Sequence, residues 1–305
     1  MNRRHILKLI GISPLVIACG ASNRTIQANA LATTSQIGDI LNQLLGDRLP
    51  HATLIRPGLD PHTYKATQSD LQRFNEASVI IYNGLNLEAS LERVLTQMPQ
   101  SKTVASLADA FSESELLMSD DGAELDPHIW FDVQLWRKAV RHVADVLLSH
   151  DASLMSHINE RAQSYDTTLE RLYTELQALI AEIPQDRRVL VTAHDAFGYF
   201  GRAFNFEVLG IQGISTATEA GIQDMSSLAN SIVERRVPAI FLESTISPKT
   251  IEALQAAVAS RGGSVKLGGE LYSDSLGEPN TPAATYVGMM QHNVRTIVSA
   301  LKGSS

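Results

Sequence analysis

The chain of 305 residues contains a single cysteine, which excludes an internal disulfide framework and any paired-cysteine zinc or redox site. Basic residues are scarce: 25 Lys and Arg stand against 33 Asp and Glu, for a formal net charge of −8. Nucleic-acid-binding proteins normally carry a basic surplus, so we expect no nucleic-acid partner. Aromatic residues make up only 6%, and no apolar run reaches the ~18–20 residues that span a bilayer.

What remains is the composition of a globular chain, with 44% hydrophobic and 19% charged residues. The length suggests about two domains or one large one. We divide the chain into a signal segment (1–18), a tether (19–29), an N-terminal lobe (30–150), a linking helix (151–184) and a C-terminal lobe (185–305).

The first 18 residues are typical of an export signal. Arg3, Arg4 and Lys8 give a positive start, and a ten-residue apolar stretch follows up to Ala18. The next residue, Cys19, follows small and apolar residues as in a bacterial lipobox, which predicts lipidation of Cys19 and a stable membrane anchor. An ordinary cleavable signal with a chance cysteine is the alternative. Both Sec export and twin-arginine export fit the sequence.

Strand-like and helix-like patterns alternate along the rest of the chain, which predicts an α/β fold with parallel sheets flanked by helices. We expect Ser35 and Ser69 to cap two of the helices. Between the two halves, residues 152–183 contain no Pro or Gly, and apolar residues recur every three or four positions. This spacing predicts one helix of about 32 residues, ~48 Å long, which would limit hinging between two lobes. A break near Ser164 is the alternative.

Two histidines stand in the same tripeptide: Asp60-Pro61-His62 and Asp126-Pro127-His128. Proline stiffens such a loop, which makes it a good mount for a metal ligand. His194 follows a predicted strand and Asp274 lies just past another, where open α/β sheets bind ligands. Three imidazoles and a carboxylate suit a first-row divalent cation. A core histidine at 194 and a turn-forming carboxylate at 274 are the structural alternatives.

Several motifs stand in order around these residues, and together they resemble the TroA-like substrate-binding lipoproteins of zinc, manganese and iron ABC importers. The resemblance runs from about residue 30 to 302. It rests on 59–64 (LDPHTY), 126–130 (DPHIW), 192–200 (TAHDAFGYF), 213–220 (GISTATEA), 240–244 (IFLES) and 269–274 (GELYSD).

The resemblance implies two α/β lobes joined by one long helix, with one metal ion held between them. Carried over by motif, the ligands are His62 and His128 from the first lobe, and His194 and Asp274 from the second. Zinc-dedicated relatives have a His- and acid-rich loop before the second histidine; residues 112–125 here have acids but no His. Strict manganese relatives often have Glu in place of His194. Both Mn²⁺ and Zn²⁺ therefore stay open.

A ligating histidine usually donates its second N–H to a carboxylate or carbonyl, and Glu243 and Asp195 are our candidates for that role. The expected function is capture of one divalent transition-metal ion and its delivery to an ABC permease. We expect an exported, monomeric, membrane-anchored lipoprotein that faces the periplasm or the cell exterior. Histidine ligands must be neutral, so metal affinity should fall below pH ~6.5.

Three other functions remain open. A zinc hydrolase would need an open position for water and a base, for which Glu270 is the candidate, although the chain has no HExxH motif. A metal-binding surface adhesin is compatible with the same site. A receptor for a metal chelate would need a wide cleft lined by aromatic or Arg side chains, which the low aromatic content disfavours.

Overall fold

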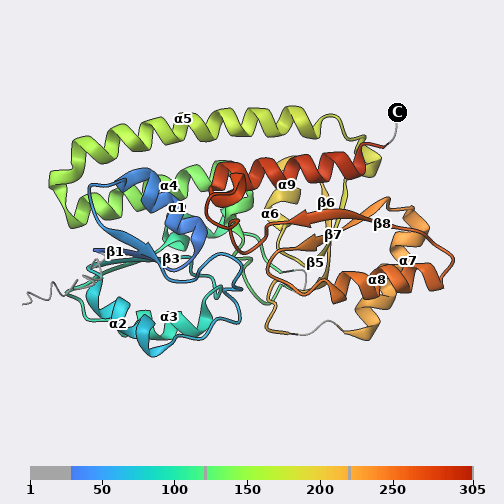
Figure 1. Ribbon diagram of the computed structural model, residues 1–305, viewed down its shortest axis with the longest axis horizontal. Helices are drawn as coiled ribbons and strands as arrows, with labels where there is room; N and C mark the ends of the chain where they lie inside the picture. Colours follow the sequence, from blue (N-terminus) through green and yellow to red (C-terminus); the bar gives the residue numbers. More distant parts are fainter. Residues whose placement is uncertain (1–28, 120–121, 219–220, 304–305) are drawn as a thin grey trace, which may run out of the picture.

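The structure is a computed structural model that describes residues 29–119, 122–218 and 221–303. The predicted export signal (1–18), Cys19 and the tether up to residue 28 lie outside the described residues, so these interpretations stay predictions. The described chain forms two α/β lobes beneath one long helix (Figure 1).

The N-terminal lobe is built on a four-stranded parallel sheet in the order β2-β1-β3-β4. The central strand β3 is almost entirely apolar, and its first three residues are buried, as expected for a strand covered on both faces. The register places Ala30 beside both His51 and Val79. The strands are β1 (Ala30–Ala32), β2 (His51–Thr53), β3 (Val79–Tyr82) and β4 (Thr103–Ser106).

Helices cover both sides of this sheet, with α1 and α4 between it and the long helix, and α2 and α3 on the other side (Figure 1). The predicted caps are wrong by one or two residues, because a threonine hydroxyl just upstream fills each role. Thr34 accepts the N–H of Ile37, and Thr67 forms a capping box with Asp70. The helices are α1 (Ser35–Leu45), α2 (Gln68–Glu76), α3 (Ala89–Leu95) and α4 (Val133–His150).

The C-terminal lobe contains two parallel strand pairs, β5-β6 and β7-β8, and β5 lies beside β7. All six residues of β5 are buried. The strands are β5 (Val189–His194), β6 (Glu207–Gln212), β7 (Ala239–Glu243) and β8 (Lys266–Leu271). The helices are α6 (Gly198–Phe204), α7 (Ile222–Arg235), α8 (Lys249–Ser260) and α9 (Tyr286–Leu301).

The long helix is α5 (Met155–Ile180), whose 26 residues span ~39 Å across both lobes (Figure 1). It is unbroken at Ser164 but shorter than predicted at both ends. Before it, the Asp151 carboxylate accepts the N–H of Ser153 and starts a separate 3-10 turn. After Ile180 the backbone bonds tighten to a three-residue spacing ahead of Pro184.

One apolar core runs under α5 and joins the lobes, because it includes residues from α1, α4, α5, α6 and α9. Trp136 of α4 stacks on Tyr286 of α9 with ring centroids 5.1 Å apart. The buried Asp39 carboxylate of α1 accepts both the Tyr165 hydroxyl and the backbone N–H of Tyr286, each at 3.1 Å. Among the described residues, no helix has the length and apolar character needed to cross a bilayer.

Candidate metal centre

The two Asp-Pro-His loops fold alike. In each, the aspartate carboxylate accepts the backbone N–H of the histidine two residues later: Asp60 with His62 at 2.8 Å, and Asp126 with His128 at 2.9 Å. This turn, with proline in the middle, fixes the backbone from which each imidazole projects. The repeated tripeptide therefore has a local structural reason, which is to hold a histidine at the end of a short, stiff loop.

The other two candidate ligands lie at the ends of strands in the C-terminal lobe. His194 is the last residue of β5 and is fully buried. Asp274 lies three residues after β8 and is 2% exposed. Because β5 and β8 are parallel to their neighbours, both residues lie at the carboxyl ends of their strands, as predicted.

The structure brings all four residues together between the lobes. One donor atom from each of His62, His128, His194 and Asp274 lies within 4.8 Å of the others. The Nε2 atoms of His62 and His128 are 3.3 Å apart. The two Asp274 oxygens face different imidazoles, with Oδ1 3.3 Å from His128 Nε2 and Oδ2 3.3 Å from His194 Nε2.

These distances have the scale of a metal coordination sphere. Four ligands placed tetrahedrally ~2.0–2.1 Å from a zinc ion stand ~3.3–3.4 Å from one another. The Asp274–His62 pair is wider, with 4.0 Å between Oδ2 and Nε2. The donor set, three imidazoles and one carboxylate, matches the chemistry of first-row divalent cations.

Burying these four polar side chains costs free energy unless a ligand binds their donor atoms. The four side chains are 0–2% exposed. Among the described residues, His194 Nε2 and both Asp274 carboxylate oxygens are buried without a hydrogen-bond partner. Because an unpaired buried polar atom normally costs ~1–3 kcal/mol, three of them facing one point indicate a ligand that satisfies them together.

Two further carboxylates contact the rings of His128 and His194 on the side away from the centre of the cluster. Asp126 Oδ1 is 2.7 Å from His128 Nδ1. Glu243 Oε1 accepts the backbone N–H of His194 at 2.9 Å, and its Oε2 lies 2.6 Å from His194 Nδ1. In both cases the carboxylate faces Nδ1, which leaves Nε2 pointing at the centre.

The pKa values follow from this arrangement. Burial lowers the pKa of His62 to about 3. Burial also opposes protonation of His128, but the Asp126 and Asp274 carboxylates outweigh it and raise the pKa of His128 to about 9. Glu243 and Asp274 likewise raise the pKa of His194 well above its ordinary value, against the effect of burial. Burial would raise the pKa of Asp274, yet the neighbouring imidazoles hold it well below its usual range.

The backbone around Asp274 is bound to the N-terminal lobe as well as to its own. The carbonyl of Ser273 accepts the indole N–H of Trp130 at 3.1 Å and the amide of Gln36 at 3.4 Å. The backbone N–H of Leu276 donates to Ser35 Oγ at 2.8 Å. The segment that carries Asp274 is therefore held against the N-terminal lobe.

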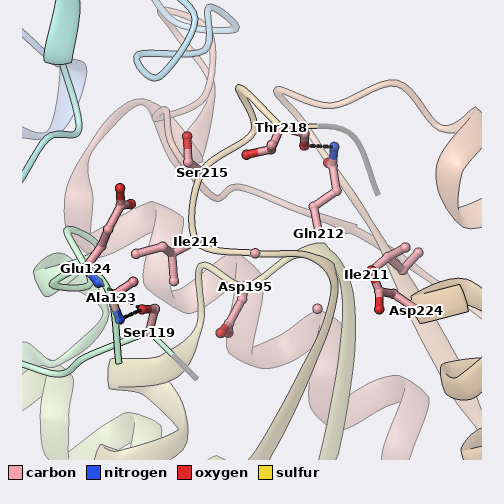
Figure 2. Close-up of a pocket in the computed structure, with 12 residues that line it drawn as sticks. Ser119, Ala123, Glu124, Asp195, Ile211, Gln212, Ile214, Ser215, Thr218 and Asp224 are labelled. Atoms are coloured by element: carbon pink, nitrogen blue, oxygen red, sulfur yellow. Dashed lines mark hydrogen bonds between the residues drawn. The ribbon is translucent and has the colours of Figure 1, made fainter. Parts of the chain in front are cut away.

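Of the two residues predicted to support the histidines, Glu243 contacts His194 directly. The side chain of Asp195 instead lines a neighbouring cavity of about 600 Å³ (Figure 2). Sequence reasoning missed Asp126 as a histidine partner. The signal was present, because Asp126 stands two residues before His128 in the repeated tripeptide.

The comparisons with known proteins agree with this fold. Residues 31–300 match the family model described as "Zinc-uptake complex component A periplasmic" (ZnuA). The chain is 42% identical over 271 residues to "Zinc-binding protein TroA" of Treponema pallidum, covering 89% of this chain and 88% of that protein. It is 39% identical over 276 residues to "Manganese-binding lipoprotein MntA" of Bacillus subtilis, covering 90% of each.

The solved structures agree too. The periplasmic zinc-binding protein TroA from Treponema pallidum superposes with a TM-score of 0.88 at 42% identity, covering 90% of this chain and 99% of that one. The chain belongs to the ZnuA family of metal-binding substrate-binding proteins of ABC transporters. The predicted family, the α/β fold with a long linking helix and the general function of metal-ion binding for transport are confirmed.

Proposed function

We propose that this protein captures one divalent transition-metal ion, Mn²⁺ or Zn²⁺, between its lobes and delivers it to a membrane permease. We propose His62, His128, His194 and Asp274 as the ligands. The observation that supports this most strongly is the convergence of four buried donors with orphaned nitrogen and oxygen atoms. Solute-binding proteins of this family work with a permease, which supplies the partner.

Binding exchanges protons for metal. Two of the imidazoles have raised pKa values because carboxylates surround them, so in the empty site protons compensate those carboxylates. A divalent cation supplies the same positive charge once the Nε2 atoms lose their protons. Because the pKa of His128 is about 9, metal affinity should already fall below that pH, and not only below the ~6.5 expected from an ordinary histidine. The ion therefore replaces an existing positive charge in a buried site, and the carboxylates behind the rings stay neutralised.

The choice between the two ions depends on coordination number. Zinc outranks manganese in intrinsic affinity for such donors, and three imidazoles with one carboxylate oxygen complete a tetrahedral zinc site. Both oxygens of Asp274 face the centre, so the carboxylate can also offer a second oxygen to an ion that prefers more ligands. The named relatives include both a zinc-binding and a manganese-binding protein.

We propose binding without catalysis. A hydrolytic zinc site keeps one position for water, whereas four protein donors fill a tetrahedral shell. Glu270, the candidate base, is an exposed residue of β8 and lies outside the buried cluster. A hydrolase would therefore lack both an open position and a base beside the ion.

X-ray absorption at the zinc edge of the loaded protein tests the proposed ligands. The expected first shell is three imidazole nitrogens and one or two carboxylate oxygens, with distances of ~2.0–2.2 Å. The Asp274→Asn variant should lengthen or remove an oxygen contribution, while Asp224→Asn, on the surface of α7, serves as the control. A shell of waters, or one unchanged by Asp274→Asn, would refute the ligand set.

We also propose that Cys19 carries the lipid anchor and that the protein acts as a membrane-anchored monomer facing the periplasm or the cell exterior. The support is the lipobox pattern ahead of Cys19 and the lipoprotein names of relatives such as the Bacillus subtilis MntA. Metabolic labelling with a radioactive fatty acid tests the anchor, since label should enter the wild type and not Cys19→Ala. Equal labelling of both would refute it.

A further inference from the structure

An ion among the four donors needs a route to solvent, because the side chains are 0–2% exposed. A cavity of about 290 Å³ reaches this cluster, and His62 is the one of the four candidate ligands that lines it. Leu85 and Pro127 of the N-terminal lobe form part of the wall, and Ile214 and Ser215 of the C-terminal lobe face them. The cavity therefore lies between the lobes and ends at a candidate ligand.

The N-terminal wall of this cavity is held firmly. Three consecutive residues, Gly84, Leu85 and Asn86, have φ values of 81°, 58° and 62°. A left-handed conformation costs a non-glycine residue ~1–2 kcal/mol, so two such residues persist only where the surroundings fix them. Here the buried Glu88 carboxylate accepts the N–H groups of Asn83 and Gly84, at 2.9 and 3.2 Å.

The C-terminal wall is joined to the N-terminal lobe by one hydrogen bond beside the cavity. The Thr216 hydroxyl donates to Asp60 Oδ2 at 2.6 Å. Thr216 follows Ser215 of the wall, and Asp60 is in the loop that orients His62. Parting of this bond would let residues 214–216, which follow β6 (Glu207–Gln212), move away from the N-terminal wall and widen the cavity.

A second cavity adjoins the first. It measures about 600 Å³ and shares Glu124, Ile214 and Ser215 with the smaller one. Figure 2 shows Glu124 on one side of it and Asp224 on the opposite side. No Lys or Arg is among the described residues that line either cavity. Carboxylates in such a cleft raise the local concentration of cations.

We propose that the cavity beside His62 is the portal through which the metal ion enters and leaves, and that the Thr216–Asp60 hydrogen bond is its latch. The proposal rests on the proposed function, since it presumes an ion at the four donors. The ion passes between Leu85 and Ser215 and meets His62 first. Closing the latch then brings residues 214–216 back against the N-terminal wall.

Stopped-flow kinetics of Zn²⁺ binding and chelator-driven release test the portal. Ser215→Trp narrows the passage without touching a candidate ligand, so the association and dissociation rate constants should both fall at least fivefold while Kd stays within twofold. An obstacle on a route raises the barrier in both directions and leaves the end states alone. Ser260→Trp, on the exposed end of α8, is the matched control and should keep wild-type rates.

Two conservative variants, which leave the fold intact, test the Thr216–Asp60 latch and the attraction of cations by Glu124. Thr216→Val removes the latch hydroxyl at constant shape, and its dissociation rate constant should rise at least threefold, with Thr218→Val as control. Glu124→Gln should lower only the association rate constant, and only at low ionic strength, whereas Glu252→Gln on α8 should not.

The outcomes separate this proposal from the proposed function. Failure of the wild type to bind one ion would refute the function itself. Normal binding with Ser215→Trp rates within twofold of wild type would overturn the portal alone. Unchanged release from Thr216→Val would overturn the latch. A shift of Kd in Ser215→Trp with an unchanged association rate would also contradict the portal, because it would mean an altered site.

Discussion

Two of the three candidate ligand histidines are positioned by carboxylates that lie outside the cluster of four donors. Asp126 faces Nδ1 of His128 at 2.7 Å, and Glu243 faces Nδ1 of His194 at 2.6 Å. Each carboxylate turns its ring so that Nε2 points at the common centre. Removing one of these rings therefore has two consequences, the loss of a metal donor and the loss of a buried carboxylate's partner.

His194→Ala should weaken Zn²⁺ and Mn²⁺ binding at least tenfold, or ~1.4 kcal/mol, because the site loses one donor and Glu243 loses its imidazole. Isothermal titration of metal-free protein checks this. His150→Ala, an exposed histidine at the end of α4, should leave Kd unchanged. An unaltered Kd for His194→Ala would remove it from the ligand set.

At this scale much was predictable from the sequence. The four converging residues were all identified there, since proline-stiffened loops and strand ends mark where side chains can project into a cleft. Support of His194 by Glu243 was also expected. The contact between Asp126 and the His128 ring was missed. The backbone N–H of His128 bonds to Asp126 just as that of His62 bonds to Asp60, but only Asp126 also contacts the ring. Its ring contact depends on the rotamers of both side chains, which no local pattern specifies.

Among the elements, one buried carboxylate ties two strands of the N-terminal sheet together. Glu88 accepts the Thr33 hydroxyl after β1 at 2.5 Å, and the N–H groups of Asn83 and Gly84 after β3. Asn83 in turn donates its amide to the carbonyl of Pro127 at 3.0 Å, next to His128. The hydrogen bonds thus run from the strand ends to the loop that carries a candidate ligand.

Burial raises the pKa of Glu88 to about 7, against an ordinary value of 4.5, despite the opposing hydrogen bonds. Because the folded pKa is the higher one, the stabilising contribution is complete below pH 4.5 and is lost as pH rises toward 7. The free energy of unfolding of metal-free protein should fall by up to about 3 kcal/mol over this range from this group.

Thermal unfolding of wild type and Glu88→Gln from pH 4.5 to 8, with a chelator present, isolates the effect. The glutamine variant lacks the titration, so the wild-type melting temperature should decline relative to it as pH rises and level off above pH 7. Other groups that titrate in this range cancel in the comparison. A difference between the two proteins that is constant with pH would contradict the assignment.

The element pattern of the sequence predicted most strands and helices but not all. The alternation of patterns predicts the fold class, but it does not by itself give the bounds of helix α4 (Val133–His150), which Asp132 caps, or of strand β4 (Thr103–Ser106). Strand β4 is short and mostly half-buried, so its residues carry little periodicity. The ends of α5 were misplaced because the absence of Pro and Gly shows only where a helix can form. It does not show where the α-helical hydrogen bonds stop and three-residue spacing begins.

For the whole molecule, the two lobes behave as parts of one packed body. The core is continuous beneath α5, and Asp39 binds partners from α5 and α9 at once. Contacts of this kind join residues more than a hundred positions apart, such as Trp130 with Ser273, and local patterns do not predict them. The limited hinging expected from the long helix is thus reinforced by side-chain packing, and the portal needs only a local loop movement.

A titration of metal-free protein with buffered Zn²⁺ and Mn²⁺, read by thermal unfolding and by stoichiometry, tests directly whether the four donors bind an ion. An ion that binds only the folded state stabilises it by ~4 kcal/mol at a free concentration 1,000 times Kd. We predict one equivalent bound and a rise in melting temperature of about 8 °C at that concentration. No stabilisation by either ion would contradict the account, because the four buried donors would then have no ligand that satisfies them.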